Sequence, residues 1–177
     1  MSIAFYRGDV LKLFDDIQTV QPTIFPSVPR LLTRLHDKIK HGVESTGGVK
    51  KWMFDLAYSQ KKSMLNSGIL SKDTIWDHLI FGKIQAKTGG KIRAIISGAA
   101  AISPDVLEFL RIVLGCQLIE GYGQSENCAA ASMSGYGVYK DAHCGMFLIF
   151  DFLVSLSIKK KRTVLLALSL VSAILTF

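Results

Sequence analysis

A strand, a helix and a second strand are predicted in succession between residues 91 and 123, and this order restricts the fold more than any other feature of the 177-residue chain. The apolar run 92–96 contains β-branched residues and is bounded by glycine at both ends, as expected of a buried strand. The run 116–119 is predicted to be the second strand. A crossover of about twenty residues that contains a helix joins parallel strands. The sequence therefore predicts a parallel βαβ unit of an α/β domain.

The helix between these two strands carries signals at both of its ends. Ser103 is a favourable N-cap residue, Pro104 suits the first helical position, and Asp105 places a carboxylate in the first turn. Gly115 is a suitable residue to end the helix. The expected apolar face consists of Val106, Leu107, Leu110, Val113 and Leu114.

The segment before this unit begins with a predicted helix. A short amphipathic helix is expected over residues 10–17, with Asp9 as its cap. Three prolines in residues 21–29 remove backbone donors, so any strand there would be short and poorly paired on one side. An extended segment that enters a helix fits this sequence better than a regular strand does. That next helix is expected to begin near Pro29 and to end at Gly42.

Two further helical stretches are expected around residues 52–65 and 74–84. The turn sequence at 66–68 separates them, and the glycine pair at 89–90 ends the second. Trp52 and Trp76 are interpreted as packing residues of these helices.

Glycine-containing turns follow both strands of the predicted βαβ unit. In open parallel sheets ligands bind beyond the carboxyl ends of the strands, so residues 97–100 and 121–123 should be neighbours at such a site. Small residues let a flat group approach the backbone, and Tyr122 would cover one face of an aromatic ring such as adenine. Ser125 offers a hydroxyl for a phosphate oxygen, and Glu126 offers a carboxylate for a phosphate-bound magnesium ion. The alternative is a structural turn with Tyr122 packed in the core.

The segment from Glu120 to Glu126, Glu-Gly-Tyr-Gly-Gln-Ser-Glu, is more specific than the glycines alone. It resembles the Tyr-Gly-x-Thr-Glu motif of the acyl-adenylate-forming superfamily. The chain as a whole resembles the long-chain fatty-acyl-CoA synthetase branch over roughly residues 4–145. The other segments that carry this likeness are residues 7–10, 21–32, 76–81 and 97–100.

This resemblance implies roles for the residues of the two turns. Tyr122 would pack on adenine, Ser125 would contact the α-phosphate, and Glu126 would bind magnesium. Gly98 to Ala100 would line the acyl-adenylate pocket. Ser125 replaces the family's threonine but keeps the hydroxyl. The implied catalytic residues are Ser125 and Glu126, and the implied nucleotide-binding residues are Gly98, Ala99, Ala100, Gly121, Tyr122, Gly123, Gln124 and Ser125.

Members of this family activate a fatty acid with ATP and magnesium to an acyl-adenylate, release pyrophosphate, and transfer the acyl group to CoA. The resemblance thus implies a long-chain fatty acid–CoA ligase, of which residues 1–145 are part of the AMP-binding domain. The phosphate loop is expected upstream of Met1, and the Thr-Gly-Asp segment, the hinge and the domain with the catalytic lysine are expected further downstream. We therefore expect a fragment without ligase activity of its own.

Residues 146–177 depart from the family pattern and are strongly apolar, apart from the basic run 159–162. The last 15 residues would span about 22 Å as a helix, which is less than the hydrocarbon thickness of about 30 Å. A helical membrane anchor and a nonnative extension are both open interpretations of this tail. Besides a ligase fragment, the sequence therefore allows a second function class, a membrane-associated binding or regulatory remnant without catalysis.

The formal net charge of +7 favours anionic partners such as nucleotides, CoA or anionic lipid. Nucleic acid is not expected, because the basic residues are scattered without an interleaved aromatic motif. Cys116, Cys128 and Cys144 match no metal-ligand spacing and suit buried thiols in a reducing compartment.

The first ten residues lack the pattern of a secretory signal, so export is not expected. The resemblance implies a location at the cytoplasmic face of intracellular membranes, such as the endoplasmic reticulum or the mitochondrial outer membrane. An unrelated α/β or structural interaction protein is the third function class, and ATP binding distinguishes the ligase interpretation from it.

Overall fold

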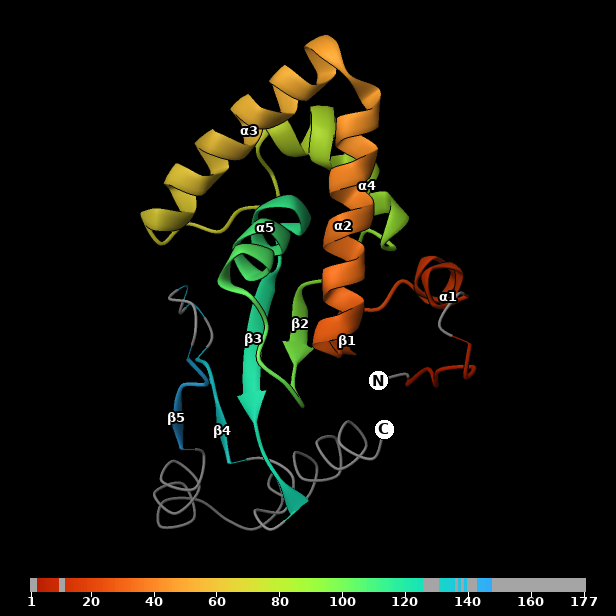
Figure 1. The fold of residues 1–177 in the computed structure, drawn as a ribbon, viewed down its shortest axis with the longest axis vertical. Coiled ribbons are helices and arrows are strands. Elements are labelled where there is room, and N and C mark those ends of the chain that lie inside the picture. Colours follow the sequence, from red (N-terminus) through yellow and green to blue (C-terminus); the bar gives the residue numbers. More distant parts are fainter. Residues whose placement is uncertain are drawn as a thin grey trace.

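The computed structural model describes residues 3–9, 12–125, 131–135, 137, 139 and 143–147. These residues form a mixed α/β structure around a sheet with the strand order β1-β2-β3-β4-β5 (Figure 1). The first three strands are parallel, and the last two add antiparallel pairs at one edge. The strands are β1 (Ile24–Ser27), β2 (Ala94–Ser97), β3 (Gln117–Tyr122), β4 (Ser132–Met133) and β5 (Met146–Phe147).

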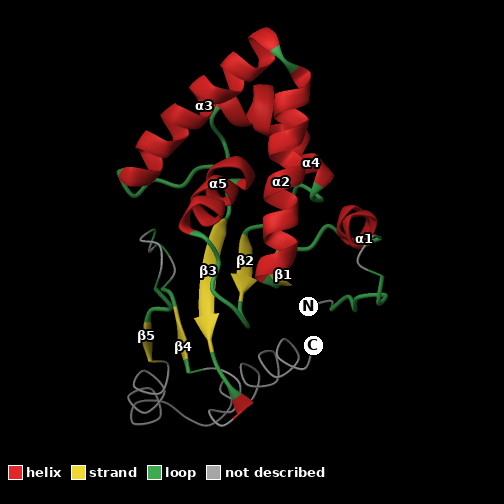
Figure 2. Ribbon diagram, in the orientation of Figure 1, coloured by secondary structure: helices red, strands yellow, loops and turns green. Residues whose placement is uncertain are grey.

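The helices lie toward one end and one side of the parallel strands, and α3 lies at the end of the molecule away from β4 and β5 (Figure 2). A π-helical turn, η1, runs directly into α4 and makes one continuous helical segment with it. The helices are α1 (Leu13–Val20), α2 (Pro29–Thr46), α3 (Gly48–Asn66), η1 (Asp77–Phe81), α4 (Gly82–Lys87) and α5 (Pro104–Leu114).

The predicted βαβ unit is confirmed. β2 pairs in parallel with β3, and α5 connects them between Pro104 and a left-handed C-cap at Gly115, whose φ is 60°. Ser103 occupies the predicted N-cap position, although its side chain makes no capping hydrogen bond. All five residues of the expected apolar face of α5 are buried.

The main core lies between the parallel strands and the helices α1, α2 and α5. Ile95 of β2 and Leu118 of β3 are both fully buried in it, next to Leu107 and Leu110 of α5. A second apolar cluster, richer in aromatic side chains, joins α3, η1, α4 and α5. In it the rings of Phe54 and Phe81 meet edge to face with centroids 5.4 Å apart, a favoured aromatic geometry.

Two helix boundaries differ from the predictions. α1 begins at Leu13 with Lys12 as its N-cap, so Asp9 is not the cap; the carbonyl oxygen of Asp9 accepts a hydrogen bond from the Lys12 N–H instead. α2 passes through Gly42 and ends at Thr46. The hydroxyl of Thr46 donates to the Gly42 carbonyl oxygen at 2.6 Å, which stabilises the final turn of the helix.

Residues 24–27 form a parallel edge strand that leads into α2, and this strand is short, as was expected of any strand in this segment. Within the described sheet β1 pairs only with β2. This position tolerates Pro26, which has no N–H to donate.

The two tryptophans have different environments. Trp52 is 64% exposed, so its interpretation as a packing residue is wrong. Trp76 is half-buried against the second cluster, and its indole N–H donates to the Gln60 amide oxygen at 2.7 Å.

The first two residues of the predicted helical tail form strand β5 instead. The rest of that tail, residues 148–177, lies outside the described residues, and its predictions stay predictions. Among the described helices, none combines the length and apolar character needed to cross a bilayer.

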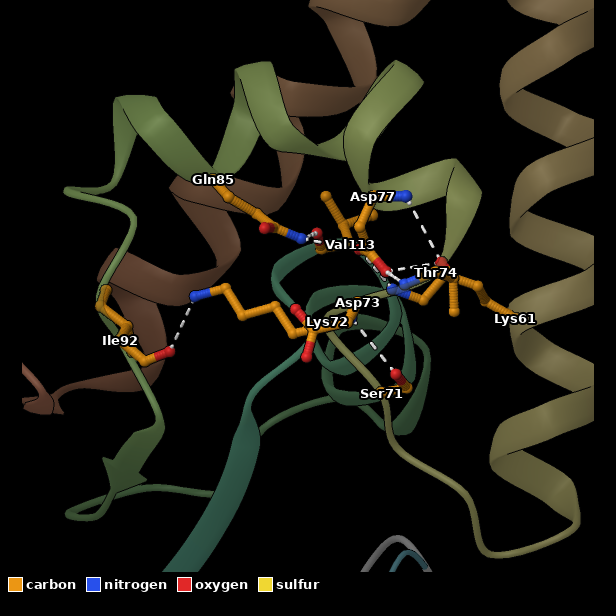
Figure 3. A network of polar contacts seen from close by, with 9 residues as sticks. All are labelled: Lys61, Ser71, Lys72, Asp73, Thr74, Asp77, Gln85, Ile92 and Val113. Carbon is orange, nitrogen blue, oxygen red and sulfur yellow. Dashed lines mark hydrogen bonds and ion pairs between the residues drawn. The ribbon is translucent and has the colours of Figure 1, made fainter.

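A buried polar network connects α3 to the segment that contains η1 and α4 (Figure 3). The Lys61 ammonium forms a 2.6 Å ion pair with Asp77 Oδ1, and these residues are 4% and 3% exposed. Gln85 donates to the same oxygen at 2.9 Å and to the Val113 carbonyl oxygen at 3.1 Å. The Thr74 hydroxyl donates to Asp77 Oδ2 at 2.6 Å. Both carboxylate oxygens of this buried group are therefore satisfied.

We expect Asp77→Ala to lower the free energy of unfolding by about 3–5 kcal/mol, because it leaves the Lys61 ammonium buried without its counter-charge. Urea unfolding followed by far-UV circular dichroism measures this change. The matched control is Asp73→Ala at an exposed position nearby, which should change stability by less than about 0.5 kcal/mol. Equal effects of the two substitutions would contradict the structural role of the ion pair.

Candidate nucleotide-binding turns

The carboxyl ends of the three parallel strands lie side by side. Ser27, Ser97 and Glu120 are partners in register on β1, β2 and β3. Residues 98–100 follow β2 directly, whereas Gly121 and Tyr122, although predicted to lie in a turn, are the last two residues of β3 and pair with β4. A Cβ built on Gly98 would lie 3.7 Å from the Gly121 carbonyl oxygen, so the two segments are in contact distance. The prediction that residues 97–100 and 121–123 are neighbours is confirmed.

Tyr122 is 50% exposed at the end of β3. Its carbonyl oxygen accepts a hydrogen bond from the Ala131 N–H at 2.9 Å, and its backbone pairs with Ser132 of β4. The backbone is thus held by the sheet while the side chain keeps an accessible surface. The alternative in which Tyr122 is packed in the core is wrong.

The structure describes all of the other predicted site residues except Glu126. Ala99, Ala100, Gln124 and Ser125 are exposed, and Gly98, Gly121 and Gly123 are partly exposed. Glu126 lies outside the described residues, so its predicted magnesium contact stays a prediction. Within the described residues no group of three or more His, Cys, Asp or Glu side chains is placed to hold a metal ion.

Ala99 has a φ of 73°, in the left-handed region that side chains with a Cβ rarely adopt. This residue lies in the turn between β2 and α5, next to the Gly121 turn. Backbone strain of this kind persists only where the surrounding structure holds it, and it is concentrated at binding and catalytic sites. The sequence did not predict this feature, because a positive φ is usual for glycine and rare for alanine.

Buried polar residues beneath the turns were also missed. Ser27 and Ser97 are 6% and 2% exposed, and neither hydroxyl has a hydrogen-bond partner among the residues that the structure describes. Ser134 holds the end of β3, because its hydroxyl accepts from the Glu120 N–H at 2.9 Å and its N–H donates to the Glu120 carbonyl oxygen at 2.8 Å. The available signal was a serine as the last residue of both β1 and β2, at the edge where ligands of parallel sheets bind.

The cysteines take no part in these turns among the described residues. Cys116 is buried, and burial raises the pKa of its thiol to about 12, so the thiol stays protonated and unreactive. Its interpretation as a buried structural thiol is confirmed. Cys144 is only half-buried, and Cys128 lies outside the described residues.

We expect Ala99→Gly to raise the free energy of unfolding by up to about 1 kcal/mol, because glycine adopts a positive φ without the Cβ penalty. The neighbouring Ala100→Gly, at a residue without a positive φ, should lower it by about 0.5–1 kcal/mol through added freedom of the unfolded chain. Thermal or urea unfolding of both variants measures the difference. A loss of stability in Ala99→Gly equal to that in Ala100→Gly would argue against strain at Ala99.

The sequence of this chain is similar to those of known ligases. Long-chain-fatty-acid–CoA ligase 1 of Cavia porcellus is 46% identical over 151 residues, which cover 85% of this chain and 21% of the relative. Long chain acyl-CoA synthetase 7, peroxisomal, of Arabidopsis thaliana is 45% identical over 145 residues, which cover 82% of this chain and 21% of the relative. The chain therefore spans about a fifth of the length of these curated relatives.

A solved structure gives a more distant match. The crystal structure of the anthranilate CoA ligase AuaEII in complex with anthranoyl-AMP aligns with 81% of this chain and 20% of that chain, with 14% identity and a TM-score of 0.48. The family model described as AMP-binding enzyme matches residues 1–156. This match covers most of the sequence, and the predicted resemblance is confirmed: the chain belongs to the AMP-binding enzyme family.

Proposed function

We propose that residues 97–125 form part of the adenylate site of an ATP-dependent long-chain fatty acid–CoA ligase. The observation that carries this proposal is the contact of two small-residue turns at neighbouring carboxyl ends of a parallel sheet, with an exposed tyrosine beside them. The identity of 46% to a long-chain-fatty-acid–CoA ligase supports the substrate class. The whole reaction would convert a fatty acid, ATP and CoA to acyl-CoA, AMP and pyrophosphate.

The residues of the turns would act mainly by binding and positioning. Tyr122 would stack on adenine, because it is 50% exposed while its backbone is held by the pairing of β3 with β4. The backbone of Gly98 to Ala100 would approach the acyl-adenylate closely, with Ala99 already held in an unusual conformation. The exposed hydroxyl of Ser125 would donate to a phosphate oxygen. Gly121, Gly123 and Gln124 complete the proposed nucleotide contacts.

Magnesium belongs to this proposal through Glu126. A carboxylate is the kind of ligand that magnesium takes when it also binds substrate phosphates. When bound, the ion would neutralise phosphate charge.

Two further parts of the proposal concern the chain as a whole. Residues 1–145 would be part of the AMP-binding domain. The apolar tail predicted for residues 146–177 would begin only after β5, which pairs with β4, and would contact a membrane. The proposed location is the cytoplasmic face of an intracellular membrane.

The first experiment is calorimetric titration of the purified 177-residue chain with ATP and magnesium. We expect Tyr122→Ala to weaken ATP binding by about tenfold, because a stacked base loses its aromatic partner. Tyr122→Phe should retain most of the affinity, because the ring is kept. Tyr6→Ala is the matched control, since Tyr6 is similarly exposed at 44% but lies outside the turns.

Glu126→Ala tests the metal contact in the same titration. Its affinity should fall only when magnesium is present. If the parent chain did not bind ATP, this result would contradict the proposed adenylate site and favour a membrane-associated remnant. Equal weakening by Tyr6→Ala and Tyr122→Ala would show that the tyrosine effect is not local.

We also expect residues 1–177 alone to form no measurable acyl-CoA from fatty acid, ATP and CoA. The sequence contains no glycine- and hydroxyl-rich phosphate loop, and groups that align and neutralise phosphates contribute several orders of magnitude in rate. A coupled assay for pyrophosphate release measures this. Turnover that disappears in a parallel preparation of Glu126→Ala would refute the expectation, because contaminating ligase would be present in both.

A further inference from the structure

A groove of about 700 Å³ opens at the amino end of the parallel strands. Arg93 directly precedes β2, and Thr23 directly precedes β1, so both mark the end of the sheet opposite to the proposed adenylate turns. Figure 3 shows several of the lining residues where the segment with η1 and α4 faces the loop that carries Lys72. The groove is lined by Thr23, Lys72, Asp73, Asp77, His78, Gly82, Gln85, Gly90, Lys91 and Arg93.

The lining of this groove is positively charged. Lys91 and Arg93 are exposed, and Lys72 is held in place by hydrogen bonds from its ammonium group to the carbonyl oxygens of Gly90 and Ile92, at 2.6 and 3.3 Å. Of the two carboxylates in the lining, Asp77 is ion-paired with buried Lys61, which leaves Asp73 to oppose three cations.

Apolar side chains border the groove on its helical wall. Ile75 is 75% exposed and Leu79 is 58% exposed, although both are large and apolar. They are four residues apart and therefore lie on one side of the helix, next to the groove residues His78 and Gly82. Exposed Lys83 continues this spacing. The wall thus carries apolar residues at one end and a cation at the other.

We infer that this basic groove and its apolar border, Ile75 and Leu79, dock on the surface of an anionic lipid bilayer. Apolar side chains that enter the headgroup boundary together with Lys and Arg beside it are the features of interfacial binding to anionic membranes. The groove lining contains no Phe, Tyr or Trp on which a nucleic-acid base could stack, and His78 is its one aromatic ring. The surface lies at the opposite end of the sheet from the nucleotide turns, so this inference does not depend on the proposed adenylate site.

The charge component is tested with the full 177-residue chain and vesicles of phosphatidylcholine, with or without 30 mole per cent phosphatidylserine, a composition on the order of that of anionic cell membranes. Sedimentation with vesicles gives the partition coefficient. Lys91→Gln/Arg93→Gln should lower partition into anionic vesicles by about 30-fold, since each cation near the surface contributes about fivefold. Lys50→Gln/Lys51→Gln, which removes the same charge from exposed positions on α3, should lower it by less than about threefold.

The apolar component is tested with Ile75→Ser/Leu79→Ser. Partition into anionic vesicles should fall by at least about tenfold, because two side chains that would be buried in the interface become polar. Val20→Ser/Val49→Ser is the matched control at residues 50% and 72% exposed, and it should leave partition nearly unchanged. Far-UV circular dichroism verifies that all four variants are folded.

Three outcomes would overturn the inference. Equal effects of a variant pair and its control would show that net charge or general hydrophobicity governs binding. Equal partition into neutral and anionic vesicles would show that the basic groove does not contribute to membrane binding. Release from vesicles by soluble glycerophosphoserine would show that the groove binds a free phosphate ester rather than a bilayer surface. Unchanged calorimetric ATP binding by Lys91→Gln/Arg93→Gln is expected in every case, which keeps this test separate from that of the adenylate site.

Discussion

The parallel pairing of β2 with β3 is the constraint on which the proposed site depends. Ile95 and Leu118 are partners in this register and are both fully buried against α5. A slip of one residue would turn either side chain away from that core, so packing fixes the register. The same register places Ser97 beside Glu120. Because α5 returns the chain parallel to β2, the turns after both strands meet at one edge, where backbone contacts to a ligand are possible.

The helical layer depends on a different interaction. Burial lowers the pKa of Lys61, and the hydrogen bond and charge of Asp77 oppose that shift. Asp77 in turn receives hydrogen bonds from Thr74 and Gln85, so the ion pair is part of a satisfied network rather than an isolated pair of charges. Gln85 also donates to the last turn of α5 through Val113. The helix that borders the basic groove is thereby tied to the helix of the βαβ unit.

Sequence reasoning succeeded where local signals and packing agree. The strand, helix and strand of the βαβ unit and the contact of its two turns follow from apolar runs, Pro104 and Gly115. It failed at Gly42, because a glycine ends a helix only where packing does not continue it, and Ile39 and Val43 on either side of Gly42 pack against the second apolar cluster. It also placed Trp52 in the core, although helical spacing alone does not say which face of α3 is covered.

The remaining features arise from tertiary contacts that no local pattern encodes. The positive φ of Ala99 lies in the connection between β2 and α5. The Lys61–Asp77 pair connects residues 16 positions apart in sequence, and each would be expected on the surface if taken alone. Both features have a consequence for function. One holds a turn at the carboxyl edge of the sheet, and the other supports a helix at the amino edge, so nucleotide and lipid would be bound at opposite ends of the same parallel strands without competing for the same residues.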